Sequence, residues 1–160
     1  MSCFPTGVAV VTGMREGVPV GMAANSFTSV SLDPLLVLFC AAHTSSTWPQ
    51  IKETQAFAVN ILPEQAVELA RRFAEKDADR FAGVNYRRGV TDSPIMVDAA
   101  AFLECRIERI HEAGDHVIVV GSVLDLGEQS ADEPLVFHRS EYRELRRVPE
   151  ELSYRSNHWG

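Results

Sequence analysis

The segment that decides the fold lies at residues 24–34 and reads "ANSFTSVSLDP". It carries one amide and four hydroxyl side chains, and the apolar run "LLVLFCAA" follows at residues 35–42. A continuous apolar run beside a turn signal predicts a strand at residues 35–41 that is buried on both faces. The polar segment before it has two interpretations. Its hydroxyls either hold a planar ligand rich in donors and acceptors, or they bond to their own backbone in turns.

Short apolar runs separated by turn residues continue on both sides of this segment. A hairpin is predicted around Glu16–Gly17, where a valine-rich run turns back on itself. Further strands are predicted at residues 7–12, 56–62, 102–110, 116–124 and 134–138. Helices are predicted at residues 46–54, with Pro49 in the first turn, and at residues 63–82, which carry one apolar face. Because strands do not alternate regularly with helices, the pattern indicates a mainly β protein, a closed antiparallel barrel with two helical insertions.

The strand predicted at residues 102–110 alternates apolar and charged side chains. Cys105 and Ile107 fall on one face, whereas Glu104 and its charged neighbours fall on the other, which predicts one buried and one solvated face. The cysteines are Cys3, Cys40 and Cys105, and no CxxC pair occurs. We interpret Cys40 and Cys105 as buried free thiols, in keeping with a reducing cytoplasm.

Length, composition and charge exclude several classes of protein. The chain has 160 residues, 46% of them hydrophobic and 23% charged, which suits one soluble domain with its own core. The net charge of -7 argues against a nucleic-acid partner. No apolar run is long enough for a membrane span, and no secretory signal is recognisable, so a cytoplasmic location is expected. The five histidines show no metal-binding spacing, and no metal is expected.

Two further stretches carry candidate ligand-binding groups. The stretch "AAHTSSTWP" at residues 41–49 joins a predicted strand to a predicted helix. The hydroxyls of Ser45, Ser46 and Thr47 there either bind a phosphate or simply cap the helix. "GDH" begins a strand after a tight turn, so His116 either bonds a ligand or caps that turn. No GxGxxG or Walker pattern is present, which argues against a Rossmann site.

Eight motifs occur in a fixed order and together carry a family resemblance. They are "FPTGVAVVT", "GMAANSFTSVSLDPLLVLFC", "FAVNIL", "LARRFA", "DRFAG", "FLEC", "GDHVIVVGSV" and "PLVFHRSEYREL". The series, from about Phe4 to Leu145, closely resembles the flavin reductase family of FMN-binding split barrels, and above all the small reductase components of two-component flavin-dependent monooxygenases. The resemblance implies a Greek-key split barrel at residues 1–148 that forms a homodimer, followed by a polar tail at residues 149–160.

The resemblance also implies where ligands bind. Residues 25–31 would run along the isoalloxazine ring and ribityl chain, residues 45–47 would lie towards the phosphate, and His116 would lie on the nicotinamide side as the catalytic residue. The implied cofactor-binding residues are Asn25, Ser26, Phe27, Thr28, Ser29, Val30, Ser31, Ala42, Ser45, Ser46, Thr47, Phe73 and Ala74.

The function implied by the resemblance is reduction of FAD or FMN by NADH or NADPH. The reduced flavin would then leave by diffusion for a separate oxygenase component. Two alternatives stay open at this point. One is an enzyme that keeps its flavin and reduces another acceptor, and the other is a flavin-binding protein without catalytic activity.

Overall fold

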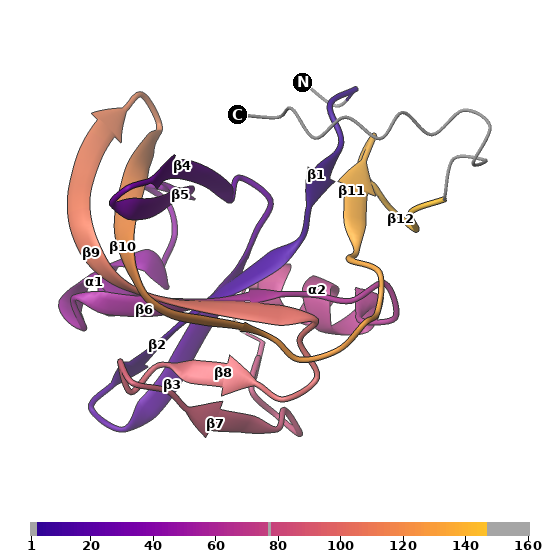
Figure 1. The fold of residues 1–160 in the computed structure, drawn as a ribbon, viewed down its shortest axis with the longest axis horizontal. Helices are drawn as coiled ribbons and strands as arrows, with labels where there is room; N and C mark the ends of the chain where they lie inside the picture. The colour runs from indigo at the N-terminus through magenta and orange to yellow at the C-terminus, as the bar shows by residue number, and fades with distance from the viewer. Residues whose placement is uncertain (1–2, 77, 147–160) are drawn as a thin grey trace.

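Antiparallel pairing of seven strands builds the main sheet of the computed structural model, which describes residues 3–76 and 78–146 (Figure 1). In spatial order these strands are β3 (Val18–Ala24), β2 (Ala9–Arg15), β6 (Ala56–Ile61), β9 (Ala101–Ala113), β10 (His116–Glu128), β5 (Leu35–Ala42) and β4 (Thr28–Leu32). A second sheet joins β1 (Thr6–Gly7), β11 (Val136–His138) and β12 (Glu141–Arg143), and a third joins β7 (Tyr86–Arg88) to β8 (Pro94–Met96). The expected mainly β fold with two helices is confirmed.

Two tight turns fix the register of the longest hairpins. Glu16 and Gly17 have φ values of 51° and 80°, so β2 returns as β3 through a turn with two left-handed residues. The predicted hairpin at this position is confirmed. Gly114, with φ of 68°, opens the turn of the β9–β10 hairpin, where Ala113 pairs with His116. This register sets His116 at the very start of β10.

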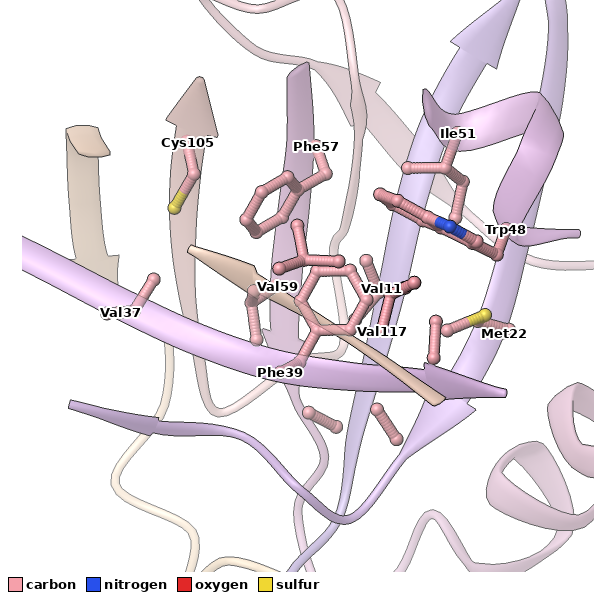
Figure 2. Packing of buried hydrophobic residues seen from close by; sticks show 14 residues of the cluster. Val11, Met22, Val37, Phe39, Trp48, Ile51, Phe57, Val59, Cys105 and Val117 are labelled. Carbon is pink, nitrogen blue, oxygen red and sulfur yellow. The ribbon is translucent and has the colours of Figure 1, made fainter. Parts of the chain in front are cut away.

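The sheet buries side chains on both faces. On β2, Val11 points into the barrel, whereas Val10 packs against a cluster on the outer side. Inside the barrel, the Phe39 ring makes T-shaped contacts with Phe57 and Trp48 at centroid distances of 5.1 and 5.8 Å (Figure 2). Outside it, α2 (Val67–Ala74) covers the sheet through its buried Phe73. Strand β5 departs from the prediction, since its residues alternate between buried and half-buried and are not buried on both faces.

Both helices are shorter than their predicted ranges. Helix α1 (Trp48–Glu53) has Pro49 in its first turn as predicted. Helix α2 was expected to span residues 63–82 but covers only eight of them. It ends because Glu75 adopts an extended conformation, with ψ of 145°, and the described residues that follow, 76 and 78–82, are not helical. None of the described helices is long and apolar enough to span a membrane.

The solvated face expected for β9 is wrong at Glu104, which is 0% exposed. Its carboxylate accepts hydrogen bonds from the Val90 N–H at 3.0 Å, the Thr91 N–H at 2.8 Å and the Thr91 hydroxyl at 2.7 Å. The β7–β8 connection therefore folds over this part of β9 and excludes water from the carboxylate. The polar tail expected at residues 149–160 lies outside the described residues.

Candidate active site

A pocket of about 360 Å³ opens where the end of β3 lies near the end of β5. Alanines supply much of its wall, namely Ala23, Ala24, Ala41, Ala42 and Ala74. Such small side chains leave room for a flat ring to approach the backbone, whose N–H and C=O groups can bond the ring's polar edge. The remaining wall comes from Met22, Cys40 and Phe73 within β3, β5 and α2, from the connections that follow these elements, and from the first residue of β10.

The Ser26 hydroxyl links the two strands at the mouth of this pocket. It accepts a hydrogen bond from the Cys40 N–H at 2.8 Å and lies 3.3 Å from the Cys40 carbonyl oxygen, to which it donates. Its hydroxyl is thus engaged with a neighbouring strand. Asn25, next to it, is exposed and lines the pocket, so its carboxamide is within reach of a ligand.

The structure gathers most of the predicted site residues around this pocket and leaves one group away from it. The residues that line it are Asn25, Ser26, Ala42, Ser45, Ser46, Thr47, Phe73, Ala74 and His116. Phe27 instead packs against the inner core cluster. Thr28, Ser29, Val30 and Ser31 belong to β4, an edge strand of the main sheet, and do not line this pocket. Their contact with flavin stays a prediction.

The three hydroxyls of residues 45–47 differ in what they contact. The Ser45 hydroxyl accepts hydrogen bonds from the N–H groups of Thr47 at 3.3 Å and Trp48 at 3.1 Å, so it caps α1. Thr47 is buried, and its hydroxyl oxygen accepts a bond from Arg80 at 2.6 Å. That bond leaves the hydroxyl proton of Thr47 available for a ligand. Ser46 is exposed at the pocket edge.

Arg80 lines the pocket, although it was not among the predicted ligand-binding residues. One nitrogen, Nη1, donates to the Gly21 carbonyl at 2.8 Å and to the Thr47 hydroxyl at 2.6 Å. Nε and Nη2 donate to the Glu75 carbonyl at 3.1 and 2.5 Å. All of these acceptors are neutral, so the positive charge remains available to an anion. The signal was its place in "DRFAG", one of the motifs that carried the resemblance.

His116 lines the pocket in a fixed orientation. Its Nδ1 lies 2.7 Å from the Asp115 carboxylate. The hydrogen bond to His116, followed by the charge of that ring, lowers the pKa of Asp115 below its ordinary value. An ionised carboxylate can only accept, so Nδ1 carries a proton, and Nε2 is the acceptor when the ring is neutral. Across residues 3–76 and 78–146, no group of three or more acidic, histidine or cysteine side chains is arranged to hold a metal.

The family model described as "Flavin reductase like domain" matches residues 1–146. The chain belongs to this flavin reductase family. A flavin reductase of Pseudomonas putida is 45% identical over 140 residues, which cover 87% of this chain and 82% of the relative. The reductase subunit HsaB of a flavin-dependent monooxygenase from Rhodococcus jostii (strain RHA1) is 40% identical over 139 residues, which cover 87% of this chain and 71% of the relative.

A solved structure places the fold in the same flavin reductase family. The NADH:FAD oxidoreductase SgcE6 of Streptomyces globisporus C-1027, in complex with NAD and FAD fragments, matches with a TM-score of 0.84 and 39% identity. The match covers 93% of this chain and 89% of that chain. The family, the split-barrel fold and the oxidoreductase class that the resemblance implied are therefore confirmed.

The residues present in this flavin reductase fit a flavin nucleotide. A flat ring matches the small side chains at the ends of β3 and β5. A phosphate matches the part of the pocket lined by Lys76 and Arg80. The volume of about 360 Å³ lies within the ~300–1,000 Å³ range of small-molecule sites.

Proposed function

We propose that the chain is an NAD(P)H-dependent flavin reductase that supplies reduced FAD or FMN to a separate flavin-dependent oxygenase. The observation that carries the proposal is the alanine-lined pocket, bordered by the Arg80 guanidinium and by His116. Neutral acceptors alone surround the guanidinium in the bonds described above, so a phosphate would be its natural counter-charge. The family membership supports the same reading.

In this mechanism the protein binds and orients, while hydride transfer between nicotinamide and flavin is supplied by the two bound nucleotides. Arg80 and the Thr47 hydroxyl would hold the phosphate, and that contact would orient the ring relative to β3 and β5. Asn25 and the backbone beside it would donate hydrogen bonds to the edge of the ring, where reduction supplies negative charge. His116, whose Nδ1 bonds the Asp115 carboxylate, would contact and position the nicotinamide.

Exchange of the flavin with solvent follows from the exposure of the pocket edge. Asn25, Ser46, Ala74 and Lys76 are all exposed lining residues. A flavin held against such an edge can leave once it is reduced, which is what delivery to a separate oxygenase requires. We therefore assign flavin as a substrate of the reaction.

Two finer assignments belong to the same proposal. Val30 and Leu32 are exposed apolar side chains on β4, at the edge of the main sheet, and this supports burial of that edge against a second copy of the chain. Light scattering should give the mass of a dimer, and Leu32→Glu should lower it to that of a monomer.

The three free cysteines support a cytoplasmic location.

The experiment that tests the proposed function is NADH consumption by the purified protein, with FAD and then FMN titrated in. Saturable dependence on added flavin supports a reductase that uses diffusible flavin. Consumption without added flavin points to a tightly held flavin and another acceptor. No consumption with NADH or NADPH contradicts the proposal and favours a flavin-binding protein without catalytic activity.

A further inference from the structure

A second pocket, of about 400 Å³, adjoins the first one along Ser46, Thr47 and Arg80, which line both. We propose that this second pocket receives the adenosine end of FAD, so that FAD is the preferred flavin of this chain. The inference rests on the proposed function, because it assumes that the first pocket holds the flavin ring. It goes further by assigning residues that choose between FAD and FMN.

Arg80 lies at the junction of the two pockets and is held there. Its Nη1 spans the Gly21 carbonyl, which belongs to a residue of the second pocket, and the Thr47 hydroxyl, which belongs to both. In the part of the chain that the structure describes, no carboxylate lies within 4.0 Å of its guanidinium. A phosphate bound at this cation marks the end of FMN. In FAD the chain of atoms continues through a second phosphate to a ribose and an adenine, and the second pocket lies where that continuation begins.

The walls of the second pocket suit a nucleoside better than another phosphate. The β3 residues Val18, Pro19 and Val20 give one apolar side, and Phe81 contributes an aromatic ring. That ring is fixed by an edge contact with Phe73, at a centroid distance of 5.1 Å. A rigid apolar wall can pack against adenine without first being ordered.

The polar groups of the second pocket point to the same ligand. Asp79 and the Gln50 amide lie among its lining residues. A carboxylate accepts hydrogen bonds from ribose hydroxyls or from the adenine amino group, and it repels a further phosphate. Charge therefore changes sign along the two pockets, from the cations Lys76 and Arg80 to the anion Asp79. The phosphates and nucleoside of FAD present groups in that same order.

The test measures equilibrium binding of FAD, FMN and riboflavin to the purified protein in the absence of any hydride donor. FAD should bind at least about tenfold more tightly than FMN, a difference of the size expected when one additional group is buried. The variant Val18→Trp adds a large ring to a side chain that is 61% exposed at the start of β3. It should raise the Kd of FAD about tenfold and change the Kd of FMN less than about twofold. Val90→Trp, at a side chain that is 72% exposed and lines neither pocket, is the matched control.

Three results would overturn the inference. FAD and FMN could bind equally, or Val18→Trp could weaken both by the same factor. The variant could also leave FAD binding intact and raise the KM for NADH, which would assign the second pocket to the adenosine end of the hydride donor. Asp79→Ala is an independent test. It should raise the Kd of FAD several-fold and leave the Kd of FMN unchanged. If the unaltered protein binds no flavin at all, the proposed function itself fails, and that outcome is distinct from equal binding of FAD and FMN.

Discussion

Replacing Arg80 with alanine tests the phosphate site most directly. The change removes the guanidinium that joins the Gly21 carbonyl, the Thr47 hydroxyl and the Glu75 carbonyl. Two effects are expected. The connection after α2 loses its attachment to β3 and α1, and the pocket loses the cation that a ligand phosphate would meet.

The two effects can be separated by magnitude and by choice of ligand. A hydrogen bond to a charged group contributes about 1.5–3 kcal/mol when its partner cannot be replaced. Since 1.4 kcal/mol corresponds to a tenfold change in Kd, loss of the phosphate contact should raise the Kd of FMN by roughly 10- to 100-fold. Riboflavin has the same ring and ribityl chain but no phosphate, so its Kd should rise less than about threefold.

Fluorescence titration of FMN and riboflavin against the unaltered protein and against Arg80→Ala gives all four Kd values. Arg80→Lys keeps the charge but loses the planar fork, so its Kd for FMN should lie between those of the unaltered protein and Arg80→Ala. Arg15→Ala is the control, because the Arg15 side chain forms an exposed ion pair with Glu53 at 2.6 Å and lines neither pocket. If FMN and riboflavin were weakened by the same factor, Arg80 would act through the fold alone, and the assignment of the phosphate site would be wrong.

Three other substitutions test separate parts of the structure. His116→Ala should raise the KM for NADH or lower kcat, because the ring held by Asp115 lines the pocket, and an unchanged kcat/KM would contradict its positioning role. Glu104→Gln should lower the free energy of unfolding by about 1–3 kcal/mol in urea, since an amide replaces a carboxylate that meets three donors, whereas the exposed Glu108→Gln should change it little. Burial raises the pKa of the Cys105 thiol to about 12, with the Glu104 carboxylate adding to the rise, so the folded thiol keeps its proton where the unfolded one ionises. The unfolding free energy should therefore fall as the pH rises from 9.0 towards 12, and Cys105→Ala should lack that component.

Local patterns were enough to predict two hairpin turns and strands in the regions of β2, β3, β5, β6, β9, β10 and β11, but not β4, β7, β8 or β12. Glycines at positions 17 and 114 each sit at positive φ in a hairpin turn, which is why the chain reverses where the sequence indicated. The start of α1 was likewise predicted from a local feature, Pro49 in the first turn of the helix. In each case the deciding residues lie within a few positions of one another, so no tertiary contact was needed.

The features that could not be predicted depend on contacts between distant segments. The end of α2 is set at Glu75, whose carbonyl is taken by Arg80, and nothing in the apolar pattern of residues 63–82 marks that point. The burial of Glu104 depends on the β7–β8 connection folding over it. For the same reason Arg80 was not among the predicted site residues, because its acceptors on β3 and before α1 lie 59 and 33 positions away.

The contacts of Ser26 explain one role of the polar segment at residues 24–34. The Ser26 hydroxyl accepts a hydrogen bond from the Cys40 N–H and donates one to the Cys40 carbonyl. These are the two backbone groups that a neighbouring strand would otherwise have paired with. The ends of β3 and β5 are thus joined by a side chain in place of a backbone ladder, and the ladder from β4 to β5 begins only at Thr28 and Leu38. A continuous ladder would have closed the space where the alanine-lined pocket opens. Ser26, a small hydrogen-bonding residue in a stretch that makes a poor strand, therefore takes the place of that ladder beside the alanine-lined pocket.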